Sequence, residues 1–136
     1  MNGFTVREAA ALLGVSDDTV RRWADAGRLE ISKTGSRQTI AGTQLLPLLA
    51  ELAAESALAA TFPAAKASAR NRFTGIITGV TRDGVMAQVD LQAGPFRVVS
   101  LMSREAADEL GLEPGMLASA SAKATVVTIE LPDPHS

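Results

Sequence analysis

Residues 5–27 read TVREAAALLGVSDDTVRRWADAG, and this stretch decides how the first half of the chain folds. Thr5 with Glu8 three residues later forms a capping box, in which each side chain accepts a backbone N–H at the start of a helix. An apolar helical face follows, and Gly14 suits the left-handed position after the helix. Ser16 is a good N-cap for a second short helix. The stretch predicts a helix-turn-helix.

A hairpin and a third helix are expected after this motif. Residues 29–40 alternate around a turn at Gly35, which is the position of a wing. Thr43 can cap a third helix that runs to about Ala60, with Pro47 near its first turn, where a missing N–H does least harm. This helix carries a wide apolar face, so we expect a partner helix to cover it.

The second half of the chain has mostly strand-like spacing. Asp83-Gly84 between two apolar runs is a strong hairpin signal. Ser103 caps a single helix that ends at Gly111. The expected strands are residues 73–80, 85–91, 96–102, 116–123 and 125–131. Five short strands with one helix before the fourth predict a small OB-like barrel.

The expected fold class is therefore α+β, with an N-terminal winged helix-turn-helix and a C-terminal small OB-like β-barrel. Pro63 and the small residues after it predict a linker between the two. The expected parts are residues 1–62 for the helix-turn-helix domain, 63–67 for the linker, 68–131 for the barrel and 132–136 for a tail.

Composition argues against an enzyme. The 136 residues include no Cys and one His, His135, and their formal net charge is −2. These counts exclude a Cys nucleophile and a thiolate metal site, and they disfavour a Ser-His-Asp triad or a His-based metal cluster. We expect no direct protein–metal ligands. Because the chain has no overall basic field, any binding of nucleic acid depends on where the cations are placed.

The sequence also argues against a membrane span. The first residues lack the basic cluster and apolar core of a signal peptide. The most apolar stretch, residues 45–62, contains Glu51 and Glu55, each of which would cost roughly 2–3 kcal/mol at a bilayer centre. We expect a cytoplasmic protein.

The second helix of the helix-turn-helix is the first candidate for function. Thr19 and Arg22 lie three residues apart on one face, and Arg21 flanks them. Such a helix can enter the major groove of DNA, while cations on the hairpin contact phosphates. The candidate DNA-binding residues are Ser16, Thr19, Arg21, Arg22, Lys33 and Arg37. The alternative is a solvated helix in a three-helix packing unit.

An oxyanion site is the second candidate. Ser68 and Arg70 lie at the start of the barrel, and Ser100 and Ser103 bracket a strand-to-helix corner. A tetrahedral dianion needs several hydrogen-bond donors and one or two cations, which these residues and Lys123 offer. On spacing alone the signal is weak, because serines more often cap helices and lysines more often lie on edge strands.

The first half resembles a known family. Residues 4–10, FTVREAA, with TVRRW at 19–23 and AGRL at 26–29, are similar to the MerR/excisionase winged-helix group. The resemblance covers roughly residues 3–60. It implies that Arg21 and Arg22 lie in a recognition helix and that Lys33 and Arg37 belong to a basic wing. The wing, GSRQT at 35–39, has fewer cations than many relatives carry there.

The second half resembles another family, the molbindin (Mop/TOBE) domains, over residues 67–131. SARN at 68–71, SLMSREAADELG at 100–111 and AKAT at 122–125 carry the likeness. The resemblance implies that molybdate or tungstate binds between subunits. The implied ligand groups are Ser68, Arg70 and Asn71 of one chain and Ser100, Ser103, Lys123 and Ala124 of its partner, or the reverse. Ala124 stands where many relatives have Ser, which leaves only the backbone N–H at that position.

Together the two resemblances predict a molybdate- or tungstate-responsive DNA-binding transcriptional regulator, similar in logic to ModE-type regulators. We expect a homo-oligomer, a dimer or larger, because one helix-turn-helix reads only a half-site of double-stranded DNA. One alternative is a molybdate storage or buffering protein whose first domain serves assembly. A barrel that binds single strands is a weaker alternative, because Phe73 and Phe96 are its only aromatic residues for stacking.

Overall fold

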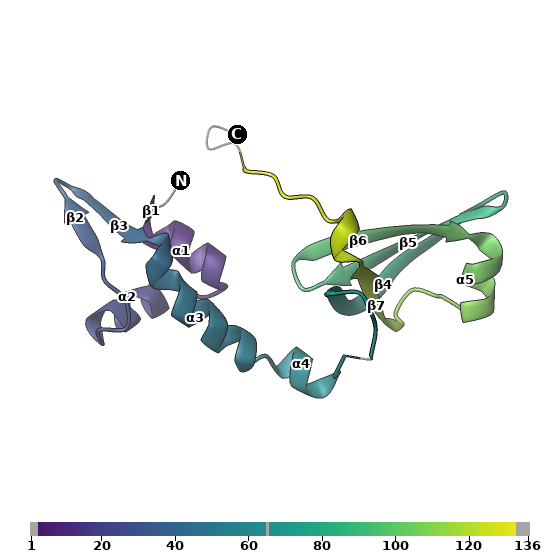
Figure 1. Cartoon of the computed structure of the whole chain (residues 1–136), viewed down its shortest axis with the longest axis horizontal. Helices are drawn as coiled ribbons and strands as arrows, with labels where there is room; N and C mark the ends of the chain where they lie inside the picture. Colours follow the sequence, from purple (N-terminus) through teal and green to yellow (C-terminus); the bar gives the residue numbers. More distant parts are fainter. Residues whose placement is uncertain (1–2, 65, 133–136) are drawn as a thin grey trace. The chain divides into compact units, whose positions relative to one another are not determined.

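The computed structural model describes residues 3–64 and 66–132. The chain divides into two compact units, one that reaches Ala57 and one from Leu58 to Leu131. Each unit has its own secondary structure and its own apolar cluster, and each is described by itself (Figure 1). No helix in the described ranges is long and apolar enough to cross a membrane.

The first unit is a helix-turn-helix with a small antiparallel sheet. Its elements are β1 (Gly3–Phe4), α1 (Val6–Leu13), α2 (Asp17–Asp25), β2 (Ser32–Thr34), β3 (Arg37–Ala41) and α3 (Gly42–Ala54). Strand β3 lies between β1 and β2 and pairs antiparallel with both. The predicted wing is thus the β2–β3 hairpin, which turns at Gly35 (φ 63°).

Local hydrogen bonds explain where the first two helices begin and end. The Glu8 N–H donates to Thr5 Oγ1 at 3.1 Å, and the Thr5 N–H donates to Glu8 Oε1 at 2.8 Å, so the predicted capping box is confirmed. Gly14 follows α1 with φ 72°, as expected for a left-handed cap. The Thr19 N–H donates to Ser16 Oγ at 3.1 Å, which confirms Ser16 as the cap of α2.

The first core holds these elements together. Val20 from α2 and Ile40 from β3 are completely buried. The other buried members are Val6, Ala9, Ala10, Leu13, Leu29, Leu45 and Leu48. Burial of each large aliphatic side chain stabilises the unit by about 1.5–3 kcal/mol before entropy is counted. The core fixes α2 through Val20, and it leaves the opposite face of that helix exposed.

The third helix differs from the prediction at both ends. Thr43 is not its cap: α3 begins at Gly42 directly after β3, and no side chain caps it. The helix ends at Ala54, and a separate short helix, α4 (Ala57–Thr61), follows. At the break the Ser56 N–H bonds to Ala53 O, so the last turn of α3 closes with an i to i−3 bond.

The second unit is a curled antiparallel sheet with one helix. Its elements are β4 (Asn71–Asp83), β5 (Met86–Ala93), β6 (Phe96–Ser103), α5 (Arg104–Leu110), β7 (Leu117–Ala122) and the 3₁₀ turn η1 (Ala124–Val126). The strand order is β6-β5-β4-β7. The long strand β4 pairs with β7 through its first half and with β5 through its second half. The sheet therefore forms the half-barrel seen in Figure 1.

Two features of β4 allow the sheet to curl. Its register with β5 shifts between Ile77 and Gly79, which is a bulge that bends the strand. At Gly75 the two strands approach so closely that an added Cβ would lie 2.0 Å from Gln92 O. Only glycine fits there without a backbone shift. The buried cluster on the inner face consists of Ile77, Val89, Leu91 and Ala93.

The predicted fifth strand is absent from the described part of the chain. Ser103 and Gly111 bound α5 as expected, and β7 corresponds to the predicted fourth strand. Residues 125–131, however, are not a strand: η1 takes up Ala124–Val126, and the next residues are extended without a partner strand. The η1 turn closes by a 3.0 Å bond from the Val126 N–H to Lys123 O, which ends the β7 ladder.

Candidate DNA-binding and anion-binding sites

Polar side chains form a continuous row along the exposed face of α2. Ser16 Oγ lies 3.0 Å from Thr19 Oγ1, and Arg22 Nη2 donates to the same Thr19 oxygen at 3.1 Å. The structure thus brings together three residues predicted from helical spacing. The hydrogen bond to Thr19 orients the Arg22 guanidinium, and the remaining N–H groups of that guanidinium can donate to a base edge or a phosphate.

Arg21 belongs to a separate group of cationic side chains, on the other flank of α2. A shallow hollow of about 390 Å³ is lined by Arg7 of α1, Arg21 of α2 and Lys33 of the wing. Its remaining lining residues are Thr5, Val6, Asp17, Ser36 and Gln38. Cations from three elements thus line one open hollow, together with the carboxylate of Asp17. Arg21 and Lys33 were predicted, whereas Arg7 was missed because the family resemblance assigns the cations to the second helix and the wing.

Arg37, the other predicted wing cation, has a nearby carboxylate. The pKa of Glu8 is lowered first by its hydrogen bonds with Thr5 and then by the positive charge of Arg37. Glu8 therefore offsets part of the positive charge of Arg37.

Arg28 holds the end of α2 in place. Its guanidinium lies 5.0 Å from the centroid of the Trp23 ring, and its Nη2 lies 2.6 Å from Glu51 Oε2 of α3. The ion pair is partly exposed, so it contributes at most about 1 kcal/mol, and the cation–π contact adds a similar amount. Both interactions fix the orientation of α2 relative to α3. Arg28 was not among the residues predicted to bind DNA.

The predicted anion-binding residues divide between the two ends of the second unit. Asn71 pairs with Ala122, and its Nδ2 donates to Ala122 O at 3.1 Å. Asn71 therefore lies beside Lys123 and Ala124 of the same chain. The expectation from the sequence assigned Asn71 to one subunit and both Lys123 and Ala124 to the other. Ala124 begins η1, so its backbone N–H has no acceptor within that turn. The assignment of these residues to a ligand stays a prediction.

Ser68 and Arg70 come just before β4 and are exposed. Their place in the chain puts them near Asn71, at the end of the sheet where β7 finishes. The side chains that one chain gathers at this end are thus one hydroxyl, one guanidinium, one amide and the ammonium of Lys123. This is a donor-rich set that suits an oxyanion.

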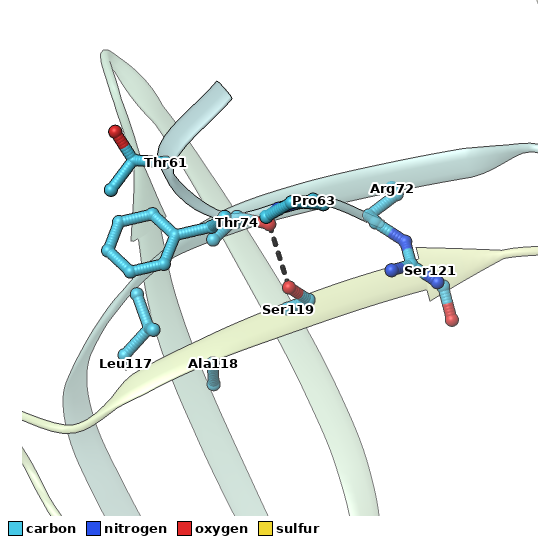
Figure 2. Close-up of a pocket in the computed structure, with 9 residues that line it drawn as sticks. Thr61, Pro63, Arg72, Thr74, Leu117, Ala118, Ser119 and Ser121 are labelled. Carbon is cyan, nitrogen blue, oxygen red and sulfur yellow. Dashed lines mark hydrogen bonds between the residues drawn. The ribbon is translucent and has the colours of Figure 1, made fainter. Parts of the chain in front are cut away.

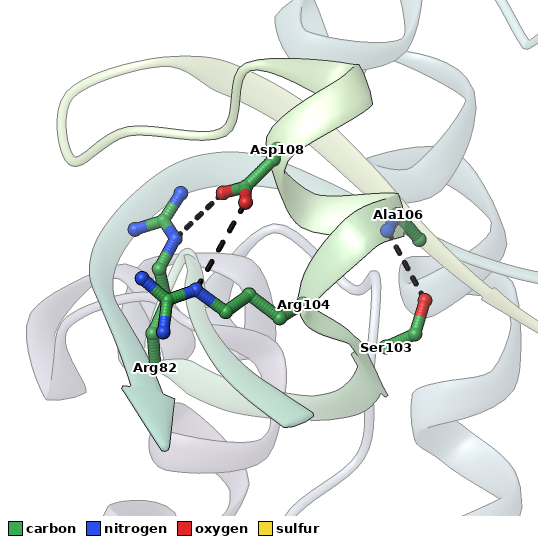
Figure 3. A network of polar contacts seen from close by, with 5 residues as sticks. All are labelled: Arg82, Ser103, Arg104, Ala106 and Asp108. Carbon is green, nitrogen blue, oxygen red and sulfur yellow. Dashed lines mark hydrogen bonds and ion pairs between the residues drawn. The ribbon is translucent and has the colours of Figure 1, made fainter. Parts of the chain in front are cut away.

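The two serines of β6 have different surroundings. Ser100 lines an apolar groove together with Ser121 and Ala122 of β7, near the residues just described. Ser103 instead accepts the Ala106 N–H at 3.1 Å as the cap of α5 (Figure 3). Ser103 pairs with Met86, at the Asp83 end of β4. Ser103 and Asn71 therefore lie near opposite ends of the 13-residue strand β4.

Helix α5 is tied to β4 by an ion-pair network. Asp108 accepts from Arg82 Nε at 2.8 Å, and Arg104 Nε lies 4.0 Å from the other oxygen of the same carboxylate (Figure 3). These groups are partly exposed, and their role is to hold the helix on the sheet. The described residues contain no cluster of three His, Asp or Glu side chains with metal-binding geometry.

A polar hollow on the outer face of β4 and β7 was not predicted. Arg72 and Thr74 of β4 lie across from Ser121 and Ser119 of β7, and Thr74 Oγ1 is 2.7 Å from Ser119 Oγ (Figure 2). The hollow measures about 570 Å³, and Phe62 and Pro63 also line it. Part of the expected linker therefore packs on the sheet. The alternation of serines in β7 is a sequence signal for a polar outer face. It does not reveal that Phe62 and Pro63 pack against this face.

The architecture defines a class of protein in which a helix-turn-helix unit is joined to a small curled β-barrel unit. Residues 4–51 match the family model of a helix-turn-helix domain, and residues 67–129 match that of the TOBE domain. The chain thus carries a helix-turn-helix domain in its first unit and a TOBE domain in its second. No protein with a curated function matches the chain.

Three solved structures are similar to the second half of the chain. MopII from Clostridium pasteurianum is 34% identical over 48% of this chain and 100% of its own, with a TM-score of 0.46. A molybdate-binding protein from Sporomusa ovata is 24% identical over 49% of this chain and 100% of its own, with a TM-score of 0.47. The cytoplasmic molybdate-binding protein ModG is 39% identical over 44% of this chain and 43% of its own, with a TM-score of 0.42.

Proposed function

We propose that the protein is a molybdate- or tungstate-responsive DNA-binding transcriptional regulator that binds the oxyanion between the TOBE domains of a homo-oligomer. The observation that carries the proposal is the presence of both modules in one chain: a helix-turn-helix with cations around α2, and a TOBE domain. The proposed role requires no catalysis, and it places the protein with DNA in the cytoplasm.

In the proposed DNA complex, α2 lies in the major groove. Thr19 and Arg22 face the base edges, because their hydrogen bond holds the guanidinium along the exposed face. Arg7, Arg21 and Lys33 contact phosphates of one backbone segment, since they line the same hollow. Two such helices in a dimer read half-sites about 34 Å apart.

In the proposed anion site, one chain supplies Ser68, Arg70, Asn71 and the Lys123-Ala124 pair, and the partner supplies serines of β6. The donor set fits a tetrahedral dianion because it combines two cations with hydroxyl, amide and backbone donors. ModG is described as a molybdate-binding protein, and its likeness to residues of this domain supports the choice of anion. The anion then shifts the pairing of the TOBE domains and the spacing of the helix-turn-helix units, with a coupling of about 1–3 kcal/mol.

Titration calorimetry with molybdate, with sulfate as the control anion, tests the proposal. We expect micromolar or tighter molybdate binding, little heat from sulfate, and a ratio of anion to chain that reports shared sites. DNA binding, followed by fluorescence anisotropy, is expected to change when molybdate is added. An absence of both heat and thermal stabilisation by molybdate would contradict the sensor function.

Arg70→Ala tests the site itself. Loss of a charge-assisted donor pair is expected to weaken molybdate binding about 10-fold or more, while DNA binding without molybdate stays unchanged. Lys66→Ala is the matched control, because it removes one exposed cation from the same approach to β4. Equal molybdate affinity in the Arg70 and Lys66 variants would show that Arg70 does not contact the anion.

A further inference from the structure

Helix α3 has more apolar surface than the core of its own unit covers. Leu45 and Leu48 of this helix are buried in the first core. Leu46, in contrast, is 61% exposed, and Leu49 is 40% exposed. Because successive residues of a helix are about 100° apart, Leu49 lies about 40° and Leu46 about 100° around the helix from Leu45. The apolar surface of α3 therefore continues from the buried face onto one exposed flank.

The exposed flank is apolar along the length of the helix. We define the α3 stripe as Leu46, Leu49, Ala50 and Ala53, which follow the i, i+3, i+4, i+7 spacing of one helix face. All four residues are exposed, and none of them is polar or charged. The solvent-facing flank of a helix in a globular protein is ordinarily polar. The α3 stripe instead has the composition and spacing of a helix–helix contact.

The opposite flank of α3 has the polar contacts that the α3 stripe lacks. Glu51 lies about 160° around the helix from Leu49. Its Oε2 is 2.6 Å from Arg28 Nη2, just after α2. Gln44, on the same polar flank, accepts the Glu30 N–H with its Oε1 at 3.2 Å. The polar flank thus ties α3 to the end of α2, and a partner on the α3 stripe would leave these bonds in place.

We propose that the α3 stripe packs against the same stripe of a second copy of this chain, across a two-fold axis that passes near Leu49. The contact joins two helix-turn-helix units, whereas the proposed function names an interface between TOBE domains. The inference rests on the homo-oligomer of the proposed function, which holds the two copies close together. It requires neither the oxyanion nor DNA.

The chemistry of the stripe favours a copy of itself as the partner. A two-fold contact places the same surface on both sides, so it must be self-complementary. The α3 stripe has no charge, and its pairing sets no like charges against each other. Ala50 and Ala53 leave space beside them for the leucines of the other helix, and small residues allow the two helix axes to approach to about 8 Å. A nucleic acid would instead require cations on this flank.

The exposed area indicates how strong the contact is. From the exposures of Leu46 and Leu49 and of the alanines beside them, each stripe with its rim offers roughly 500 Å², so the pair buries on the order of 1,000 Å². Stable interfaces bury about 1,200–2,000 Å². The contact by itself is therefore weak, and it forms when another link between the copies raises their effective concentration toward the millimolar range. Because Glu51 and Arg28 tie α3 to the end of α2, pairing of α3 fixes the spacing of two α2 helices.

Cysteine cross-linking of the full chain, without molybdate or DNA, tests the contact. The chain has no cysteine of its own, so Leu49→Cys introduces a single thiol. Ala54→Cys is the matched control, because Ala54 is exposed on the same helix about 140° around from Leu49. Under mild oxidation we expect Leu49→Cys to form disulfide-linked dimers at least about 10-fold faster, since residues at the axis have suitable Cα separations. Equal rates for the two variants, or no dimer from either, would overturn the proposal.

A charge placed on the stripe provides the second test. Ala53→Glu and Ala54→Glu are each combined with Leu49→Cys. The two alanines are neighbours in the last turn of α3 and both are exposed, but only Ala53 belongs to the α3 stripe. We expect Ala53→Glu to slow cross-linking about 10-fold, because it buries a charge in the contact, and Ala54→Glu to leave the rate unchanged. Equal rates would contradict a contact through the stripe. Trp23 fluorescence checks that the first unit of each variant is folded.

These experiments separate the α3 contact from the proposed function. A chain that cross-links selectively through Leu49→Cys yet gives no molybdate heat keeps the contact and loses the sensor function. A chain that gives molybdate heat and changes its DNA binding, but cross-links equally from both positions, keeps the proposed function and loses the contact.

Discussion

The two units differ in how completely each one buries its apolar residues. The first unit closes its core within itself, with nine buried residues that come from all three of its longer helices and the wing. The inner cluster of the second unit has only four buried residues, although this unit is the longer one. The second unit leaves large apolar residues such as Ile129 and Leu131 in solvent. The difference indicates that the first unit leaves few large apolar residues exposed within one chain, whereas the second unit leaves a larger part of its apolar surface exposed.

The largest expected effect is on the closed core. Ile40→Ala removes a completely buried side chain, so we expect the first unit to lose about 2–5 kcal/mol of stability. Trp23, the only tryptophan, lies in that unit and reports its unfolding by fluorescence. Ile129→Ala is the contrasting variant, and it should leave this transition unchanged. An Ile40→Ala chain that unfolds at the wild-type temperature would refute the picture of a closed first core.

The curl of the second unit depends on one close contact between strands. Gly75→Ala would force a Cβ to 2.0 Å from Gln92 O, so the strands must separate, and we expect a loss of about 1–3 kcal/mol or more. Gly79→Ala is the control, since its Cβ would meet its nearest neighbour at an ordinary 3.6 Å. Thermal unfolding followed by circular dichroism compares the two. Equal melting temperatures would mean that the close approach is not needed.

The two arginines of α2 are expected to differ in DNA binding. Arg22→Ala should relax sequence preference by about 1–3 kcal/mol at one base pair, because Arg22 lies on the row that we propose faces the bases. Arg21→Ala should weaken binding to all sequences alike and reduce the salt slope by about one, because Arg21 lines the hollow that we propose contacts phosphates. Selection from a random DNA library, followed by salt titrations, measures both. Identical behaviour of the variants would contradict the division into two groups.

The smallest expected effect is the acid response of the first unit. Because the folded state lowers the pKa of Glu8 below its usual value of 4.5, Glu8 adds stability that is fully present above pH 4.5 and is lost as the pH falls through the folded pKa. Glu8→Gln keeps a capping side chain and should remove this part of the pH dependence. Trp23 fluorescence during acid titration tests it. Parallel acid curves for the two chains would exclude Glu8 as a contributor.

Much of the first unit could be predicted because its signals are local. The Thr5–Glu8 capping box and the Ser16 cap act over three residues, so the residue types alone specify them. Thr43 shows the limit of this reasoning. It has the chemistry of a cap, but the chain enters α3 from β3 one residue earlier, and the tertiary connection determines the start of the helix.

The candidate sites also combine contacts that local sequence predicts with contacts that only tertiary packing produces. Helical spacing placed Thr19 beside Arg22, whereas the meeting of Arg7 with Arg21 and Lys33 depends on how three elements pack. The pairing of Asn71 with Ala122, 51 residues later, follows from the strand register of β4 and β7. No local pattern encodes that register.

The alternation in residues 125–131 predicts a strand, since period two depends only on the order of apolar and polar residues, but this prediction was wrong because η1 takes up the first of these residues and no strand follows in the described part of the chain. The alternation was not sufficient to choose a partner strand. A strand is stabilised by backbone bonds to another segment, and that segment can lie anywhere in the same chain or in another copy. The sequence therefore specified the caps, the helix-turn-helix and the strand periods, whereas the curled sheet determined which edges and which groove remain open, because strand pairing is a non-local interaction.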